Sequence, residues 1–234
     1  MKKLTLLTTA VLTAFVANVA VAEDRIAANQ KTPGMFAGET KLSAQETLRR
    51  SGEVYRTLGR DQAYTVPQSI ISRANCVAVV PNVVTAAAVI GGSHGSGVAS
   101  CKTAAGKWSQ PLFVNMSGVS FGAQIGAKSS DYIIYFTDNK AMNALKNGRV
   151  QFGADTSVVA GSFEKSFELG NAGAVIFQHT SGAFVGASVM GGAITQDEEQ
   201  NRAYYGKNVQ TAALLNGTES ISGTNSETFT TVLP

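Results

Sequence analysis

The sequence is poor in charge, cysteine and histidine, and each scarcity argues against a class of function. Only 15% of the 234 residues are charged, and the formal net charge is +3. A protein that binds duplex nucleic acid needs a concentrated excess of Lys and Arg, so we expect no nucleic-acid partner. The two histidines, His94 and His179, do not stand at ligand spacing from either cysteine, which argues against a metal site. No Walker loop occurs, and the glycine run 91–97 lacks the dinucleotide-binding order, so no cofactor is expected.

The apolar stretch at the N-terminus is too short and too interrupted to favour a permanent membrane span. Lys2 and Lys3 precede the apolar region, and Ala20-Val21-Ala22 has the small-x-small pattern that a signal peptidase requires. We therefore predict a signal peptide over residues 1–22, cleaved after Ala22, and a mature protein that is periplasmic or secreted. Removing 22 of the 234 residues leaves 212, which suits one well-buried domain, and the loss of two lysines lowers the net charge from +3 to +1.

Two cysteines, Cys76 and Cys101, remain in the mature chain. In an oxidising compartment an even number of cysteines suggests a disulfide, and here only one pairing is possible. The bridge would close a loop of about 25 residues and stabilise the fold by about 3 kcal/mol. The alternative is two buried free thiols.

The remaining charge is distributed unevenly along the chain. Residues 41–73 carry a net charge of +3, and residues 195–234 carry a net charge of −3. One interpretation is a pair of solvated faces that attract each other weakly. The other is a basic end that contacts anionic lipid headgroups, where each Lys or Arg contributes about 1 kcal/mol.

Regular structure is predicted to begin at Ser43, after a flexible leader over residues 23–40. Ser43 and Glu46 have the capping-box spacing, and the apolar residues that follow, up to Leu58, fall on one arc of a helix. Three basic residues share the strip opposite that arc: Arg49, Arg56 and Arg60. Further short helices are expected near 67–74, 138–147 and 197–205.

From Cys76 onward the pattern has a period of two, which indicates strands. The expected strands are 76–80 (stopped by Pro81), 83–90, 118–127, 132–136, 149–159, 174–179 and 183–194. The predicted fold class is therefore α+β: one compact domain over residues 41–234, with a mainly antiparallel, glycine-rich sheet that forms a sandwich or a barrel-like structure.

Glycine and small polar residues fill one face of the strand 118–127, and this face has two explanations. Either neighbouring elements pack tightly there, or a ligand such as an acyl chain approaches the backbone. In the second case Gln124 would be a polar residue that faces the ligand. Asp155, in the middle of a predicted strand, is either hydrogen-bonded structurally or part of the same polar site.

The segment Gly91-Gly92-Ser93-His94-Gly95 matches the nucleophile elbow of hydrolases, and Asp155 and His179 follow in the expected order. That motif works only at a strand–turn–helix junction. The residues after it, 96–101, predict a strand instead. A serine esterase that uses Ser93 is therefore a remote alternative, and we expect no enzyme.

The order of these motifs resembles the SYLF domain family, a lipid-binding module of exported bacterial proteins and of eukaryotic membrane and actin adaptors. The segments that carry the resemblance are Arg73–Pro81, Gly91–Val98, Phe121–Ala127, Gly153–Val158 and, most specific, Asn201-Arg202-Ala203-Tyr204-Tyr205-Gly206. The resemblance implies a compact α+β domain that binds phospholipids, phosphoinositides in the eukaryotic relatives, partly through a basic N-terminal helix. Here a signal peptide occupies the corresponding start, and no actin partner is expected outside the cytoplasm.

The leading expectation is an exported, non-enzymatic protein that binds phospholipid or a membrane surface. Arg49, Arg56 and Arg60 would contact the headgroups. The alternative is a structural or protein-interaction module of the cell envelope, with an envelope protein as its partner.

Overall fold

The computed structural model describes residues 42–59, 66–152, 158–162, 173–181, 184–186, 189–219 and 227–234. Contacts divide the chain into Met1–Thr40 and Lys41–Pro234, and every described residue belongs to the second unit. The predicted signal peptide and leader lie outside the described residues and stay predictions.

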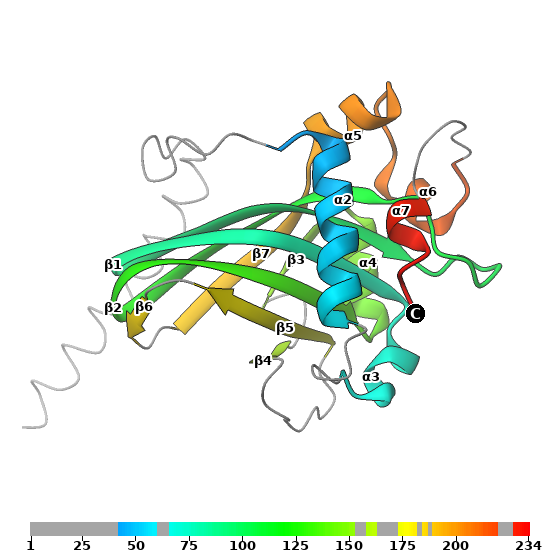
Figure 1. Ribbon diagram of the computed structural model, residues 1–234. Helices are drawn as coiled ribbons and strands as arrows, with labels where there is room; N and C mark the ends of the chain where they lie inside the picture. Colours follow the sequence, from blue (N-terminus) through cyan, green and yellow to red (C-terminus); the bar gives the residue numbers. More distant parts are fainter. Residues whose placement is uncertain are drawn as a thin grey trace, which may run out of the picture. The chain divides into compact units, whose positions relative to one another are not determined.

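Two long strands, β1 (Cys76–Cys101) and β2 (Leu112–Phe136), form an antiparallel ribbon that doubles back on itself (Figure 1). A straight strand of 26 residues would separate its ends by about 85 Å. In β1 the Cα atoms of the two end residues lie only 4.0 Å apart. The register shifts between Ala88 and Ile90, near the middle of the strand, where the ribbon reverses direction.

The other strands extend this ribbon on both sides into one curled sheet. β7 (Val189–Gln196) pairs with the first half of β2, and β3 (Arg149–Gln151) pairs with β7. β5 (Ala174–Ser181) and β6 (Phe184–Gly186) pair with the second half of β2. β4 (Val158–Ser162) pairs with β5 and makes the one parallel ladder among the described strands. The predicted α+β class with a mainly antiparallel sheet is confirmed.

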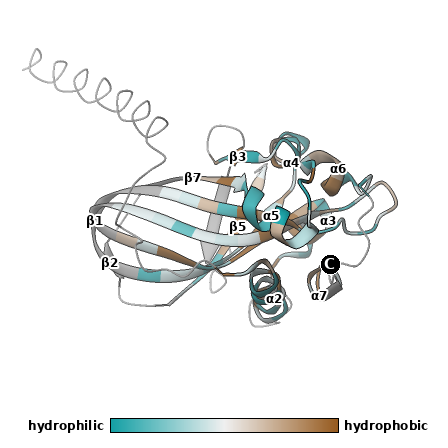
Figure 2. Cartoon of the chain, turned by 90° about the horizontal axis from the view of Figure 1, so that it is seen from above, coloured by the Kyte–Doolittle hydropathy of each residue, from teal (hydrophilic) through white to brown (hydrophobic). Residues whose placement is uncertain are grey.

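Helices cover both faces of the sheet. One face packs against α2 (Ala44–Val54), its π-helical continuation η1 (Tyr55–Gly59), α3 (Gln68–Arg73) and α7 (Glu227–Thr230). The other face packs against α4 (Asn139–Lys146) and α6 (Thr211–Asn216), and Figure 2 shows these two helices on the side of the sheet away from α2 and α7. We call the face with Cys76 and Cys101 the inner face, because its side chains from the two halves of β1 meet. The helices expected near 43–58, 67–74 and 138–147 are confirmed, whereas α6 and α7 were not predicted.

β1 does not stop at Pro81, and that prediction is wrong. A β-bulge between Val80 and Val83 carries the strand through the proline, because a bulge leaves residues outside the ladder and needs no amide donor there. Asn82 adopts the left-handed region at φ 52°, and its N–H donates to Asp131 Oδ1 at 2.8 Å. The single strand expected over 149–159 is instead divided between β3 and β4, with residues 153–157 outside the described range.

The helix expected near 197–205 is α5 (Glu198–Tyr205), and it is tied to β2 by one buried amide. Asn201 Nδ2 donates to Phe113 O at 2.8 Å and to Asp197 O at 2.7 Å, while its Oδ1 accepts from Phe113 N at 3.0 Å. Tyr205 also donates to Pro111 O. The most specific segment of the family resemblance therefore has a structural role: it attaches a helix to the sheet.

Candidate functional site

Cys76 and Cys101 form a disulfide, so the predicted bridge is confirmed. The two residues are 25 positions apart and occupy the two ends of β1. A backbone hydrogen bond next to the disulfide also connects the two ends of β1, because Lys102 N donates to Asn75 O at 2.7 Å. The bridge therefore holds the doubled-back ribbon closed at the end that the helices cover.

Two glycines in β1 allow its halves to approach each other closely. A Cβ atom on Gly97 would lie 2.2 Å from Val79 O and 2.7 Å from Val80 Cα, and one on Gly95 would lie 2.7 Å from Val83 Cγ2. No side chain larger than hydrogen fits at such distances. For these two positions, tight packing explains the glycine.

The contact between Gly95 and Val83 also fixes which residues of the two halves face each other. Side chains alternate along a strand, so a step of two residues on each half stays on the inner face. The step from Val83 to Thr85 and from Gly95 to Ser93 therefore keeps Thr85 and Ser93 on the inner face, nearer to the place where the ribbon reverses. On this face Thr85 pairs with Lys128. Ser93 pairs with Gly118, which in turn pairs with Gly192. We call these five residues the polar row: Lys128 and Thr85 on one half of the ribbon, and Ser93, Gly118 and Gly192 on the other.

The polar row contains two buried hydroxyls. Thr85 is 2% exposed and Ser93 is 6% exposed, and neither Thr85 Oγ1 nor Ser93 Oγ has a hydrogen-bond partner. Lys128, paired with Thr85 across the ribbon, is half-buried, and this burial lowers the pKa of its ammonium group. A half-buried lysine is thus the strand-pairing partner of a residue with a buried hydroxyl.

The next inner-face residues toward the disulfide are polar on one half of the ribbon only, at Ser130 and its neighbours. Ser130 Oγ and Thr180 Oγ1 are 2.9 Å apart, and Gln178 Nε2 donates to Thr180 Oγ1 at 3.1 Å. The remaining residues there are apolar and belong to the core that includes Val83, Met116 and Ile194. The polar row therefore lies at the boundary between this core and the part of the ribbon where it reverses direction.

Ser93 does not stand on a nucleophile elbow. It lies inside the second half of β1, paired with Gly118, where the hydrolase motif needs a strand–turn–helix. His179 is on the opposite face of the sheet, because its neighbours Gln178 and Thr180 are on the inner face. Asp155 lies outside the described residues. The expected strand context of Ser93 is confirmed, and the described part of the triad does not come together.

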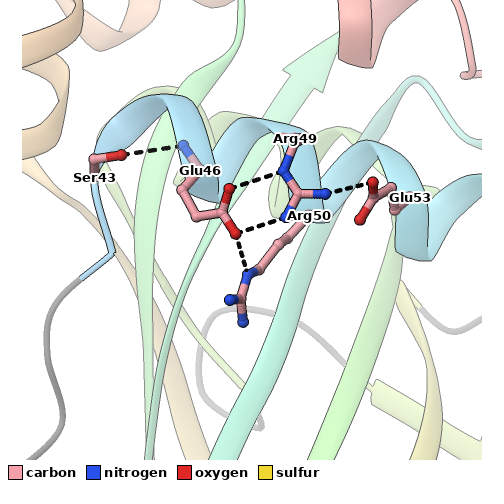
Figure 3. A network of polar contacts seen from close by, with 5 residues as sticks. All are labelled: Ser43, Glu46, Arg49, Arg50 and Glu53. Carbon is pink, nitrogen blue, oxygen red and sulfur yellow. Dashed lines mark hydrogen bonds and ion pairs between the residues drawn. The ribbon is translucent and has the colours of Figure 1, made fainter.

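The basic strip predicted on the first helix is partly neutralised within the helix (Figure 3). Arg49 binds Glu46 at 2.6 Å and Glu53 at 2.5 Å, and Arg50 also binds Glu46 at 2.6 Å. Hydrogen bonds from Arg49 and Arg50 lower the pKa of Glu46 to about 2. The same carboxylates raise the pKa of Arg49.

The other residues predicted to contact a headgroup or a ligand are Arg56, Arg60 and Gln124, and the structure describes the side chain of Arg56 alone among these three. Arg56 is exposed on η1, and Arg60 lies outside the described residues. Gln124 pairs with Gly186 through the backbone, and its side chain is outside the described set.

Sequence reasoning missed Thr85 and Lys128. The available signal was weak: Thr85 is the one polar residue of the expected strand 83–90. Its face could not be predicted, because the bulge at Pro81–Asn82 resets the alternation of side chains.

The described part of the chain lacks the features of a metal site and of a membrane-spanning helix. It contains no cluster of three or more His, Cys, Asp or Glu side chains that could hold a metal ion. Among the same residues, no helix combines the length and the apolar character needed to cross a bilayer.

Residues 117–233 match the model of the Ysc84 family, described as "Las17-binding protein actin regulator". Over 197 residues the chain is 30% identical to Protein YSC84 of Saccharomyces cerevisiae, which covers 81% of this chain and 41% of that protein. It is 28% identical over 197 residues to LAS seventeen-binding protein 3 of the same yeast, covering 81% of this chain and 42% of that protein. It is also 28% identical over 196 residues to human SH3 domain-containing YSC84-like protein 1, covering 81% of this chain and 56% of that protein. The chain spans about half the length of these curated relatives. No solved structure matches the chain.

Proposed function

Because this chain belongs to the Ysc84 family, the family of the SYLF domain, we propose that it is an exported, non-enzymatic protein that binds phospholipid at a membrane surface. The signal-peptide pattern of residues 1–22 supports export. The proposal covers this chain alone, since the match spans only 41% of the yeast relative and 56% of the human one.

One observation carries the proposal: the ribbon reverses direction in segments that have no charge. Segments 86–92, 118–127 and 184–194 contain no Asp, Glu, Lys or Arg. Strand pairing brings them together, since Ile90 pairs with Phe121, and Phe121 pairs with Val189. In Figure 1 the ribbon at this end extends past α2. A charge-free sheet end of this kind is suited to contact with a lipid bilayer.

The arginines of the first helix would supply attraction to anionic lipid, with unequal shares. Arg56 is exposed, whereas Arg49 would have to leave Glu46 and Glu53 to reach a phosphate. Each free Arg near an anionic surface contributes about 1 kcal/mol. We therefore assign the larger contribution to Arg56, and to Arg60 on sequence grounds.

Flotation with lipid vesicles tests the proposal. The mature chain should float with phosphatidylcholine vesicles and more strongly when phosphatidylglycerol is added. Ile90→Glu places a charge in the charge-free end and should abolish flotation. Ala105→Glu is the matched control, because it adds the same charge in the exposed turn between β1 and β2 at the other end of the ribbon. If the wild-type chain floats with neither vesicle and carries no co-purified lipid, the proposal fails.

A second candidate, a protein-interaction module, is favoured by the description of the family and by the name of the yeast relative, LAS seventeen-binding protein 3. For an exported chain the partner would be an envelope protein rather than an actin regulator. Recovery of a stoichiometric partner with the lipid-free mature chain would favour this candidate over lipid binding.

A further inference from the structure

The helix α2 lies on the sheet through a face of mostly small residues. The buried residues of this face are Ala44, Thr47, Leu48, Ser51 and Gly52. Leu48 is the one large apolar side chain among them. The sheet residues of the same cluster are apolar, and they include Val79, Val98 and Phe113. Because α2 buries little apolar area of its own, the hydrophobic effect holds it less firmly than it holds the strands.

The hydroxyl of Thr47 makes this contact weaker still. Thr47 is 0% exposed, and its Oγ1 has no hydrogen-bond partner among the described residues. A hydroxyl buried in this way has given up its bonds to water without replacement, which opposes the docking of α2. Tyr204 of α5 packs on the same cluster, and its buried hydroxyl also has no partner in the described part of the chain. If α2 leaves the sheet, Thr47 regains water.

The C-terminal residues 227–234, which we call the C-terminal clasp, hold α2 from the side. A Cβ atom on Gly52 would lie 2.8 Å from Thr228 O, so the backbones of α2 and α7 are in contact. Figures 1 and 2 both show α7 beside α2. At the other end of the clasp, Trp108 Nε1 donates to Pro234 O at 2.9 Å. Three apolar residues of the clasp are buried in the cluster that α2 covers: Phe229, Val232 and Leu233.

The C-terminal end of α2 is attached more firmly. It continues into η1, where Tyr55 is 1% exposed and Leu58 is 5% exposed. The hydroxyl of Tyr135 donates to the hydroxyl of Tyr55 at 3.3 Å, which connects η1 to β2. A change from α-helical to π-helical geometry is a common place for a helix to bend. The junction of α2 and η1 therefore has the features of a hinge, with η1 as its fixed side.

We propose that α2 is a lid over a lipid site. It swings away from the sheet about its junction with η1, and the acyl chains of a phospholipid bind the apolar sheet face beneath it. The C-terminal clasp keeps the lid closed in the lipid-free protein. Arg49 and Arg50 lie at the surface of the lid, where they would flank the headgroup. This inference rests on the proposed lipid binding and adds a second lipid contact, separate from the charge-free end of the ribbon.

Labelling of a thiol under the lid tests whether α2 opens. The two cysteines of the chain are bonded to each other, so Ser51→Cys adds the only free thiol. Vesicles of phosphatidylcholine and phosphatidylglycerol should speed its reaction with a maleimide about tenfold or more, because they shift the population toward the open form. Ala141→Cys is the matched control, since Ala141 is also 0% exposed but lies in α4, on the other face of the sheet. Its labelling should stay slow.

Each pattern of labelling decides the matter. Faster labelling of Ser51→Cys alone supports the lid. No acceleration in either variant, with vesicles that bind both, overturns it. Equal acceleration in both variants shows that the whole protein unfolds on the vesicle, and this also overturns the lid.

Trp108 reports whether acyl chains reach the site in the wild-type chain. It is the single tryptophan, and it packs on the cluster that α2 covers. Phosphatidylcholine with brominated acyl chains quenches a tryptophan that it contacts, so vesicles of this lipid should quench Trp108. Thr47→Val removes the hydroxyl that favours opening, and about fivefold more lipid should then be needed for half-quenching. Thr85→Val is the control, because it removes another buried hydroxyl without a partner in the described chain, in β1 away from α2.

The control should be quenched as the wild type is. Equal quenching of Thr47→Val and Thr85→Val overturns the lid. Flotation without quenching of Trp108 confines the lipid to the charge-free end, which refutes the lid and leaves the proposed function standing. Absence of flotation in the wild type refutes the lipid function itself.

Discussion

Gly97→Ala is the sharpest test of the doubled-back ribbon. The new methyl carbon would lie 2.2 Å from Val79 O. Val79 O is a backbone atom, and the methyl carbon is bonded directly to the backbone. Neither can rotate away, and Val79 O also accepts a hydrogen bond from the hydroxyl of Ser51 at 3.3 Å. Overpacking of a core typically costs about 1–3 kcal/mol, and a clash against backbone belongs at the upper end. We expect a loss of about 3 kcal/mol, which lowers Tm by about 6–12 °C in a domain of this size.

Thermal unfolding followed by circular dichroism, with the disulfide intact, measures this loss. Gly192→Ala is the control: it adds the same methyl group to the same inner face, but its nearest neighbour would be 3.1 Å away. It should cost clearly less than Gly97→Ala, because Ser117 O has to give by only a few tenths of an ångström and the alanine also stiffens the unfolded chain. If Gly97→Ala is as stable as Gly192→Ala, the two halves of β1 do not approach as described.

Three further predictions concern stability. Removing the disulfide by Cys76→Ser with Cys101→Ser should cost about 3.5 kcal/mol, the chain entropy of a 25-residue loop; an unchanged urea midpoint in non-reducing buffer would contradict it. Asn201→Ala leaves Phe113 N and O without their side-chain partner and should cost about 3 kcal/mol in urea unfolding, whereas a loss below about 1 kcal/mol would show that the clamp is dispensable. The pKa of Glu46 falls from 4.5 to about 2 on folding, so its stabilising contribution is complete above pH 4.5 and is lost as the pH falls through 2. Glu46→Gln should therefore flatten the dependence of the urea midpoint on pH between 4.5 and 2, and an equal slope in the two proteins would refute the ion-pair assignment.

The segment most specific for the family lies away from the polar row. Asn201 bonds to the backbone of Phe113 in β2, Tyr205 bonds to the carbonyl of Pro111 just before β2, and together they hold α5 against the sheet. Residues that identify a fold need not be those that bind a ligand. Replacing Asn201 should therefore affect stability first, and the proposed lipid binding only through the loss of folded protein.

Local hydrogen bonds allowed the sequence to determine several elements. Ser43 accepts from Glu46 N at 3.3 Å and Asp138 accepts from Ala141 N at 2.7 Å, as their positions before helical patterns predict. The alternation of side chains from Cys76 onward identified a mainly antiparallel sheet. The two cysteines allowed one pairing, although the choice between a bridge and free thiols stayed open until their separation in space was known.

Only the tertiary structure decided which residues meet. The bulge at Pro81–Asn82 changes the face of every residue after it in β1, and no local pattern marks its size. The reversal of the ribbon brings Gly95 close to Val83 and Gly97 close to Val79, and strand pairing sets Lys128 beside Thr85. These are contacts between distant segments, so their partners follow from the path of the whole chain. The sequence also gives the charge of each side chain. Whether that charge is available to a ligand depends on the neighbours that the side chain has in the folded protein.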